Sequence, residues 1–279
     1  MELNIFLLVI FAAILHAIWN GMVKKFDDKV ISVSAIVFGH VPISLLLIIF
    51  LPLPKIESVP YIILGAFIHQ GYQINLISAY KTGDLTKVYP IARGTGPIVA
   101  TLISIIFLGL LISKIKIFSI ILICGGIFTL GLFSGGLVKN KKEIYYSLAT
   151  GIFIGLYSLV DGYGARLSLS PLSFIGWSFI LNATIFPFTL KIINYHNVLN
   201  RVFKEAKNIF WIGGTISFVV YGIVIWCFTK APIPIIGALR ESSILFSILI
   251  GFFFLKERIT FIKILSILFI FAGVLLLKI

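Results

Sequence analysis

The sequence predicts an all-α integral membrane protein with about ten transmembrane helices, arranged as two inverted five-helix repeats. Three observations lead to this prediction: the composition, the length of the apolar runs and an internal similarity. Hydrophobic residues make up 59% of the chain and charged residues 12%, and the mean hydropathy is +1.12. Because a soluble domain carries roughly 25% charged residues, this chain has too little polar surface for a water-soluble globule.

The apolar runs are continuous and have the length that a helix needs to cross a hydrocarbon core of about 30 Å. Strands of a membrane barrel would alternate apolar and polar residues instead. The first residues lack the basic stretch and the cleavage site of a signal peptide, so we expect the first run to be retained as a helix. The predicted spans are 3–23, 31–51, 61–80, 88–110, 115–137, 145–165, 171–190, 209–229, 233–255 and 259–278.

The two halves of the chain resemble each other. Residues 112–120 are similar to residues 259–267, and Arg93 and Arg240 stand the same 147 positions apart. We therefore expect a first repeat over residues 1–138 and a second over residues 139–279. Five spans in each half is an odd number, so two tandem copies must insert in opposite orientations, as in many secondary transporters.

The basic residues are distributed unevenly over the connections. The net charge is +13, and 15 lysines and arginines fall in the odd-numbered connections against 6 in the even-numbered ones and the C-terminus. This bias predicts cytoplasmic odd-numbered connections and both termini outside. It also explains the positive charge without a nucleic-acid partner. Cys124 and Cys227 both lie in apolar runs, so neither a disulfide framework nor a cysteine metal site is indicated.

Five short motifs give a family resemblance: residues 16–20 (HAIWN), 79–85 (AYKTGDL), 88–94 (VYPIARG), 159–166 (LVDGYGAR) and 239–243 (LRESS). Together they resemble the EamA-like branch of the drug/metabolite transporter superfamily over nearly the whole chain. The resemblance implies a ten-helix transporter of small metabolites with a central cavity between the halves. It also implies cytoplasmic termini, opposite to the orientation that the basic residues predict.

Arg93 and Arg240 are the sharpest candidates for a binding site. A charge inside the hydrocarbon costs about 3 to more than 10 kcal/mol, so it is kept where it is paired or faces water. Both arginines lie among glycines and prolines, a pattern that predicts interrupted helices lining a cavity. A guanidinium there can bind a carboxylate or phosphate in bidentate fashion. The alternative is a structural ion pair, with Glu241 or Asp161 as the partner of Arg240.

Asp161 and Glu241 are the two acids that lie inside predicted spans. Burial raises a carboxyl pKa in general, so either acid could take up a coupling proton. Either could equally be a fixed counter-ion.

Further polar residues favour a cavity between the halves. His16, Trp19 and Asn20 share one face of the first helix, and Tyr157 lies four positions before Asp161 on the sixth. Helix–helix hydrogen bonding is the alternative explanation. The remaining candidates are Gln73 and Tyr89, with His69, Gln70, Tyr72 and Asn75 in the polar patch around Gln73, whereas His40 and His196 are expected to be structural or solvated.

These residues favour a secondary transporter of a small amino-acid-like zwitterion or organic anion, working by alternating access. The alternatives are a flippase for a lipid-linked substrate and an intramembrane enzyme acting on a lipid phosphate. No catalytic residue, cofactor or metal is expected, and neither a metal-ligand cluster nor a phosphate-binding GxxxxGK[ST] motif occurs. The expected partners are the substrate and the lipid bilayer, and the expected location is the bacterial inner membrane. The oligomeric state is left open.

Overall fold

The computed structural model describes residues 1–133, 141–256 and 258–278. All regular structure in these residues is helical. Nine helical segments of the described chain are long and apolar enough to cross a membrane, which confirms the predicted class of a multi-pass α-helical membrane protein. The helices of the first half are α1 (Leu3–Lys25), α2 (Lys29–Gly39), α3 (Val41–Phe50), η1 (Ile56–Ser58), α4 (Val59–Thr82), α5 (Leu85–Ile106) and α6 (Lys114–Phe133).

The second half of the described chain also has five spans, and a short helix lies in the connection after α8. Its helices are α7 (Lys141–Ser168), α8 (Pro171–Ile192), α9 (Val198–Glu205), η2 (Ile209–Gly213), α10 (Gly214–Phe228), α11 (Ile233–Arg240), α12 (Ser243–Leu255) and α13 (Phe261–Lys278).

Helix α4 supplies the tenth span. It has 24 residues, which at 1.5 Å per residue gives about 36 Å, enough to cross the hydrocarbon core. Polar side chains such as His69, Gln70 and Gln73 lower its hydropathy, and all three are buried inside the protein. These polar side chains are tolerated in a span because they face other helices rather than lipid.

Two of the predicted spans are broken helices. The second is divided at His40, between α2 and α3, and the ninth at Glu241 and Ser242, between α11 and α12. The predicted interruption near Arg93 is wrong, because α5 continues through both Pro90 and Pro97.

Close packing against α7 accompanies the unbroken helix at Arg93. A Cβ atom on Gly151 would lie 2.6 Å from the backbone oxygen of Ala92, and one on Gly155 would lie 2.9 Å from that of Gly96. The two glycines therefore form the close helix–helix contact that their four-residue spacing predicts. Packing at this distance supports the backbone of α5 where its prolines remove hydrogen bonds.

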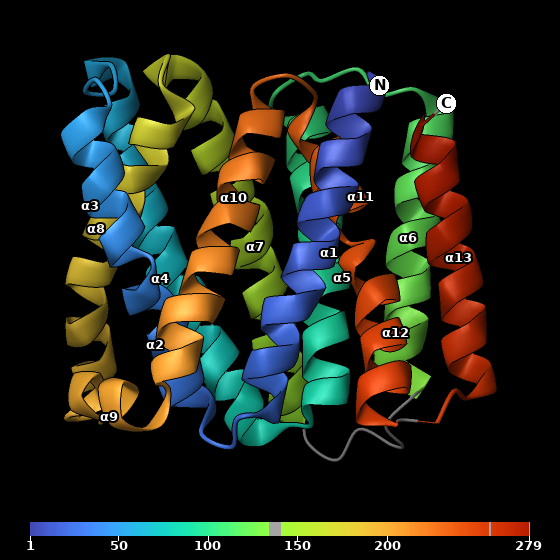
Figure 1. Cartoon of the computed structure of the whole chain (residues 1–279). Coiled ribbons are helices and arrows are strands. Elements are labelled where there is room, and N and C mark those ends of the chain that lie inside the picture. Colours follow the sequence, from blue (N-terminus) through green and yellow to red (C-terminus); the bar gives the residue numbers. More distant parts are fainter. Residues whose placement is uncertain (134–140, 257, 279) are drawn as a thin grey trace.

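The spans form a bundle with α3 and α8 at one edge and α6 and α13 at the other (Figure 1). Helix α4 packs on α7, and α1 packs on α10; α5 also packs on α7, and α12 on α1. When the two halves are exchanged, the α4–α7 contact corresponds to the α1–α10 contact, and the α5–α7 contact corresponds to the α12–α1 contact. The expected boundary between the repeats, at residues 138 and 139, lies outside the described residues, and the repeat itself stays a prediction.

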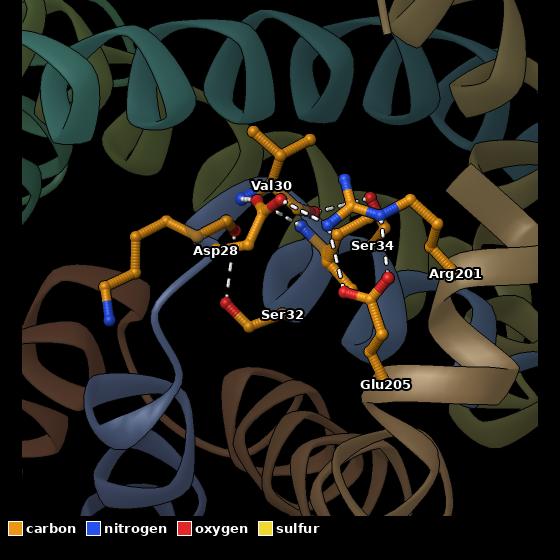
Figure 2. Close-up of polar contacts among 8 residues, drawn as sticks. Asp28, Val30, Ser32, Ser34, Arg201 and Glu205 are labelled. Atoms are coloured by element: carbon orange, nitrogen blue, oxygen red, sulfur yellow. Dashed lines mark hydrogen bonds and ion pairs between the residues drawn. The ribbon is translucent and has the colours of Figure 1, made fainter. Parts of the chain in front are cut away.

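Both termini lie at one end of the bundle, and α9 lies at the other (Figure 1). Helix α9 is fixed there by Arg201, whose guanidinium lies between two carboxylates (Figure 2). Its Nη2 atom is 2.9 Å from Asp28, and it holds Glu205 by two hydrogen bonds of 2.9 Å. Asp28 also accepts hydrogen bonds from the first backbone amides of α2, so one side chain caps that helix and binds α9.

Candidate functional site

A cavity of about 130 Å³ lies in the middle of the bundle. Side chains from α1, α2, α4 and α5 of the first half and from α7, α8, α10 and α11 of the second half form its wall. All eight predicted substrate-binding residues lie on this wall: His16, Trp19, Asn20, Gln73, Tyr89, Arg93, Tyr157 and Arg240. Sequence positions as far apart as 16 and 240 therefore meet at one place.

The two predicted arginines share one glutamate. The Nε atom of Arg93 lies 2.6 Å from one carboxylate oxygen of Glu241, and an Nη atom of Arg240 lies 3.5 Å from the other. All three side chains are nearly inaccessible to solvent, and Glu241 is completely buried. The arginines line the cavity, while Glu241 is outside the set of lining residues. Two positive charges and one negative charge give this arginine–glutamate group a net charge of +1.

The break between α11 and α12 positions this group. Proline residues at 232 and 234 begin the eight-residue helix α11, which ends at Arg240. Glu241 follows at the break, and Ser243 accepts a hydrogen bond of 3.3 Å from Nη2 of Arg93. Because the helix stops here, consecutive residues place a cation on the cavity wall and its counter-ion behind it.

Helices α1 and α5 are joined by polar contacts at Tyr89. Its hydroxyl lies 3.2 Å from Nε2 of His16 and accepts a hydrogen bond from the amide of Asn20. The ring of His16 meets Trp19 edge-on at 4.9 Å, and the guanidinium of Arg93 lies 5.7 Å from the centre of the Tyr89 ring. The predicted polar face of α1 is therefore turned toward Arg93.

Asp161 lies behind the wall and binds His69, rather than either arginine. Its carboxylate accepts a hydrogen bond of 2.9 Å from Nε2 of His69 and another from the hydroxyl of Tyr221. His69 is on the wall, where it stacks on Tyr157 at 4.3 Å. The structure thus gives the two intramembrane acids different partners: Glu241 faces two guanidiniums, and Asp161 faces an imidazole and a phenol.

Several polar atoms of wall residues are buried without a hydrogen-bond partner among the described residues. They include the indole Nε1 of Trp19, the Nε of Arg240 and the amide oxygen of Gln73. A buried polar group without a partner costs about 1–3 kcal/mol, so each such group calls for an explanation. The first two are donors and the third is an acceptor, so a molecule satisfying all three needs both kinds of group.

Sequence reasoning left out other residues of the wall. His40 is one of the lining residues. It also makes structural contacts, because its ring stacks on Phe179 at 4.3 Å and its Nε2 atom lies 3.1 Å from the hydroxyl of Ser217. Asn182 and Tyr221 are also on the wall, and each was detectable as a polar residue within an apolar run. The described residues contain no group of three or more His, Cys, Asp and Glu side chains able to hold a metal ion.

A second cavity of about 210 Å³ adjoins the first. Asn20, Tyr80 and Tyr89 belong to the walls of both cavities. The second cavity reaches Lys24, at the end of α1, and Lys263, near the start of α13. The two cavities together extend from the middle of the bundle toward the end that carries α9.

The comparisons with known proteins agree with this architecture. The model of the EamA-like transporter family matches residues 141–279. A comparison with curated proteins finds no match. One crystal structure, titled only as that of a protein, is 14% identical to this chain and has a TM-score of 0.75, covering 100% of this chain and 99% of that one. At this identity the likeness concerns the fold alone.

Proposed function

The chain belongs to the EamA-like transporter family through residues 141–279, and we propose that it is a secondary transporter for a small metabolite carrying a negative group. The substrate class is an amino-acid-like zwitterion or a small organic anion. The binding site is the central cavity, with Arg93 and Arg240 as the anchors for the negative group.

The net charge of the arginine–glutamate group is the observation that carries this proposal. Two guanidiniums and one carboxylate leave one positive charge buried beside the cavity. An isolated charge in a low-dielectric environment is costly, and an anionic group in the cavity would neutralise it. Organic cations would meet repulsion at the same place, so the site discriminates by charge.

The unpartnered polar atoms support a ligand with both acceptors and donors. A carboxylate would accept from the Nε of Arg240 and from the indole of Trp19, and an ammonium group would donate to the amide oxygen of Gln73. This division of donors and acceptors favours an amino-acid-like zwitterion within the proposed class.

Alternating access would follow from the two halves. We propose that residues 1–138 and 139–279 are inverted repeats that rock against each other around the cavity, as in other transporters built this way. The contacts that interchange when the halves are exchanged support this, and so does the family match, which begins at residue 141. The bacterial inner membrane is the proposed location.

Uptake into proteoliposomes tests the substrate class. The panel contains L-glutamate, L-glutamine, succinate and glycerol phosphate, together with tetraphenylphosphonium as an organic cation. We expect saturable uptake of at least one compound that carries a carboxylate or phosphate, and none of the cation. Saturable uptake of the cation alone would contradict the proposal.

A further inference from the structure

The hydrogen-bonded pair of His69 and Asp161 has different partners from the arginine–glutamate group. We propose that this pair is a proton-binding site that couples the uptake of one proton to the binding of the anionic substrate. The inference rests on the proposed function, because it needs an anion in the central cavity. It assigns separate roles to the two acids: Asp161 binds the proton, and Glu241 is a fixed counter-ion.

The partners of the two acids are the first reason for this assignment. Glu241 lies between two guanidiniums, one at 2.6 Å and one at 3.5 Å. Arginine is never deprotonated in proteins, so these partners keep the carboxylate of Glu241 charged. Asp161 has His69 and Tyr221 as partners, and histidine gains and loses a proton near neutral pH.

The second reason is that one carboxylate oxygen of Asp161 accepts no hydrogen bond from the described residues. Both hydrogen bonds reach Oδ2, whereas Oδ1 is buried without a partner among the described residues. Oδ1 points at Gly65 of α4, where a Cβ atom would lie 2.4 Å from it. The glycine therefore leaves room for the carboxylate at this contact, and the added proton would be held on Oδ1 or on the imidazole of His69.

The third reason is the position of His69. Asp161 is not on the cavity wall, but His69 is, and its ring is stacked on Tyr157. A proton can therefore pass between the cavity and Asp161 through the imidazole. The charged or titratable groups that face the pair from the surrounding elements are Tyr157 on α7, Tyr72 on α4, Tyr221 on α10, Arg93 on α5, Arg240 on α11 and His40 between α2 and α3.

Charge balance gives the direction of coupling. The arginine–glutamate group keeps its charge of +1 beside the cavity, and the deprotonated Asp161 offsets this charge from behind the wall, so that the four side chains sum to zero. One added proton raises this sum to +1 and favours an anion in the cavity. By linkage, a bound anion favours the proton to the same degree. Proton and anion then cross together, and each is released when access changes to the other side of the membrane.

Proton uptake on anion binding tests the inference in the purified full-length protein. L-glutamate or succinate is added in weakly buffered detergent solution with a pH indicator, at several values between about pH 5 and 8. We expect uptake approaching one proton per chain in the wild type. Asp161→Asn, whose side chain is outside the cavity wall, is expected to bind the probe and take up none. Glu143→Gln, which removes another buried acid of α7 outside the cavity wall, is the matched control and should behave as the wild type.

The outcomes separate this inference from the proposed function. If the wild type binds a probe but takes up no proton at all of these pH values, the proposed coupling site is wrong and the transporter proposal stands. If Asp161→Asn binds the probe and still takes up a proton, the site is likewise wrong. If neither probe binds and no carboxylate or phosphate of the uptake panel is transported, the proposed function itself is contradicted.

Discussion

The Nε atom of Arg93 lies 2.6 Å from a carboxylate oxygen of Glu241, although the two residues stand 148 positions apart, in different halves of the chain. The contact joins the middle of a continuous helix, α5, to the break between α11 and α12. One carboxylate thereby neutralises one of two arginines on the wall of the central cavity. The predictions below concern this group, the short helix at one end of the bundle and the orientation of the chain.

Glu241→Gln should destabilise the protein and increase its affinity for anions. The substitution leaves two buried guanidiniums without their shared counter-ion, which typically costs about 3–5 kcal/mol. A bound anion would offset part of this cost, so the variant should be stabilised by succinate more strongly than the wild type is. Thermal unfolding in detergent with and without succinate measures both effects. A variant that melts like the wild type in both conditions would show that Glu241 is not the counter-ion.

The Arg201–Glu205 contact lies within α9 and holds the guanidinium beside Asp28, so the attachment of α9 to α2 should depend on pH through Glu205. Hydrogen bonds from Arg201 lower the pKa of the Glu205 carboxyl below its usual value. A lowered pKa in the folded state means that the contact contributes stability above the ordinary pKa of about 4.3. This contribution is lost as the pH falls through the lowered value. Spin labels at Asn200→Cys and Lys25→Cys should give a narrow distance distribution at neutral pH and a broad one in strong acid.

Substitution of the arginine separates the ion pairs from other effects of acid on this connection. Arg201→Gln should give a broad distribution at every pH, because both carboxylates lose their partner. Lys204→Gln changes the same charge on the same helix and should keep the wild-type behaviour. A narrow distribution in Arg201→Gln at neutral pH would mean that packing alone holds α9.

The connection between residues 191 and 208 should face the cytoplasm. Fifteen basic residues in the odd-numbered connections, against six elsewhere in the connections and at the C-terminus, predict this orientation. Asn200→Cys is a suitable reporter, because this residue is exposed and both native cysteines are buried. An impermeant maleimide should label the variant in opened membranes and leave it unlabelled in intact cells. Ready labelling of intact cells would support the opposite orientation, which the family resemblance implies.

Much of the fold could be predicted from the sequence because the lipid bilayer imposes a simple rule. A run of about 20 apolar residues has to become a helix, and every predicted span contains one or two helical segments. The interruption at Arg93 was predicted wrongly because glycine and proline close together in a membrane span can mark either a helix break or a close helix–helix contact. Near Arg93, Gly96 allows close packing on Ile154 of α7 and Gly94 allows close packing on Phe128 of α6, whereas at Glu241 the helix does break.

The composition of the site was harder to predict than the fold. Charged residues inside spans are rare because a charge in the hydrocarbon is energetically unfavourable. This alone identified Arg93, Arg240, Asp161 and Glu241 as candidates. Which acid pairs with which base depends on helix packing, and the sequence left that choice open. Asn182, on the cavity wall, is an isolated polar residue in an apolar span, and nothing in its own segment shows which way it points.

The central claim is that Arg93 anchors the negative group of the substrate. For the panel compound with the highest uptake, Arg93→Gln should weaken apparent affinity by about 2–4 kcal/mol, which is roughly 30- to 1,000-fold. Arg93→Lys should restore only part of it, because an ammonium lacks the planar fork of the guanidinium. Thermal unfolding of each variant shows whether it is folded. Uptake by folded Arg93→Gln with unchanged affinity would show that Arg93 is only a structural partner of Glu241 and would contradict the account.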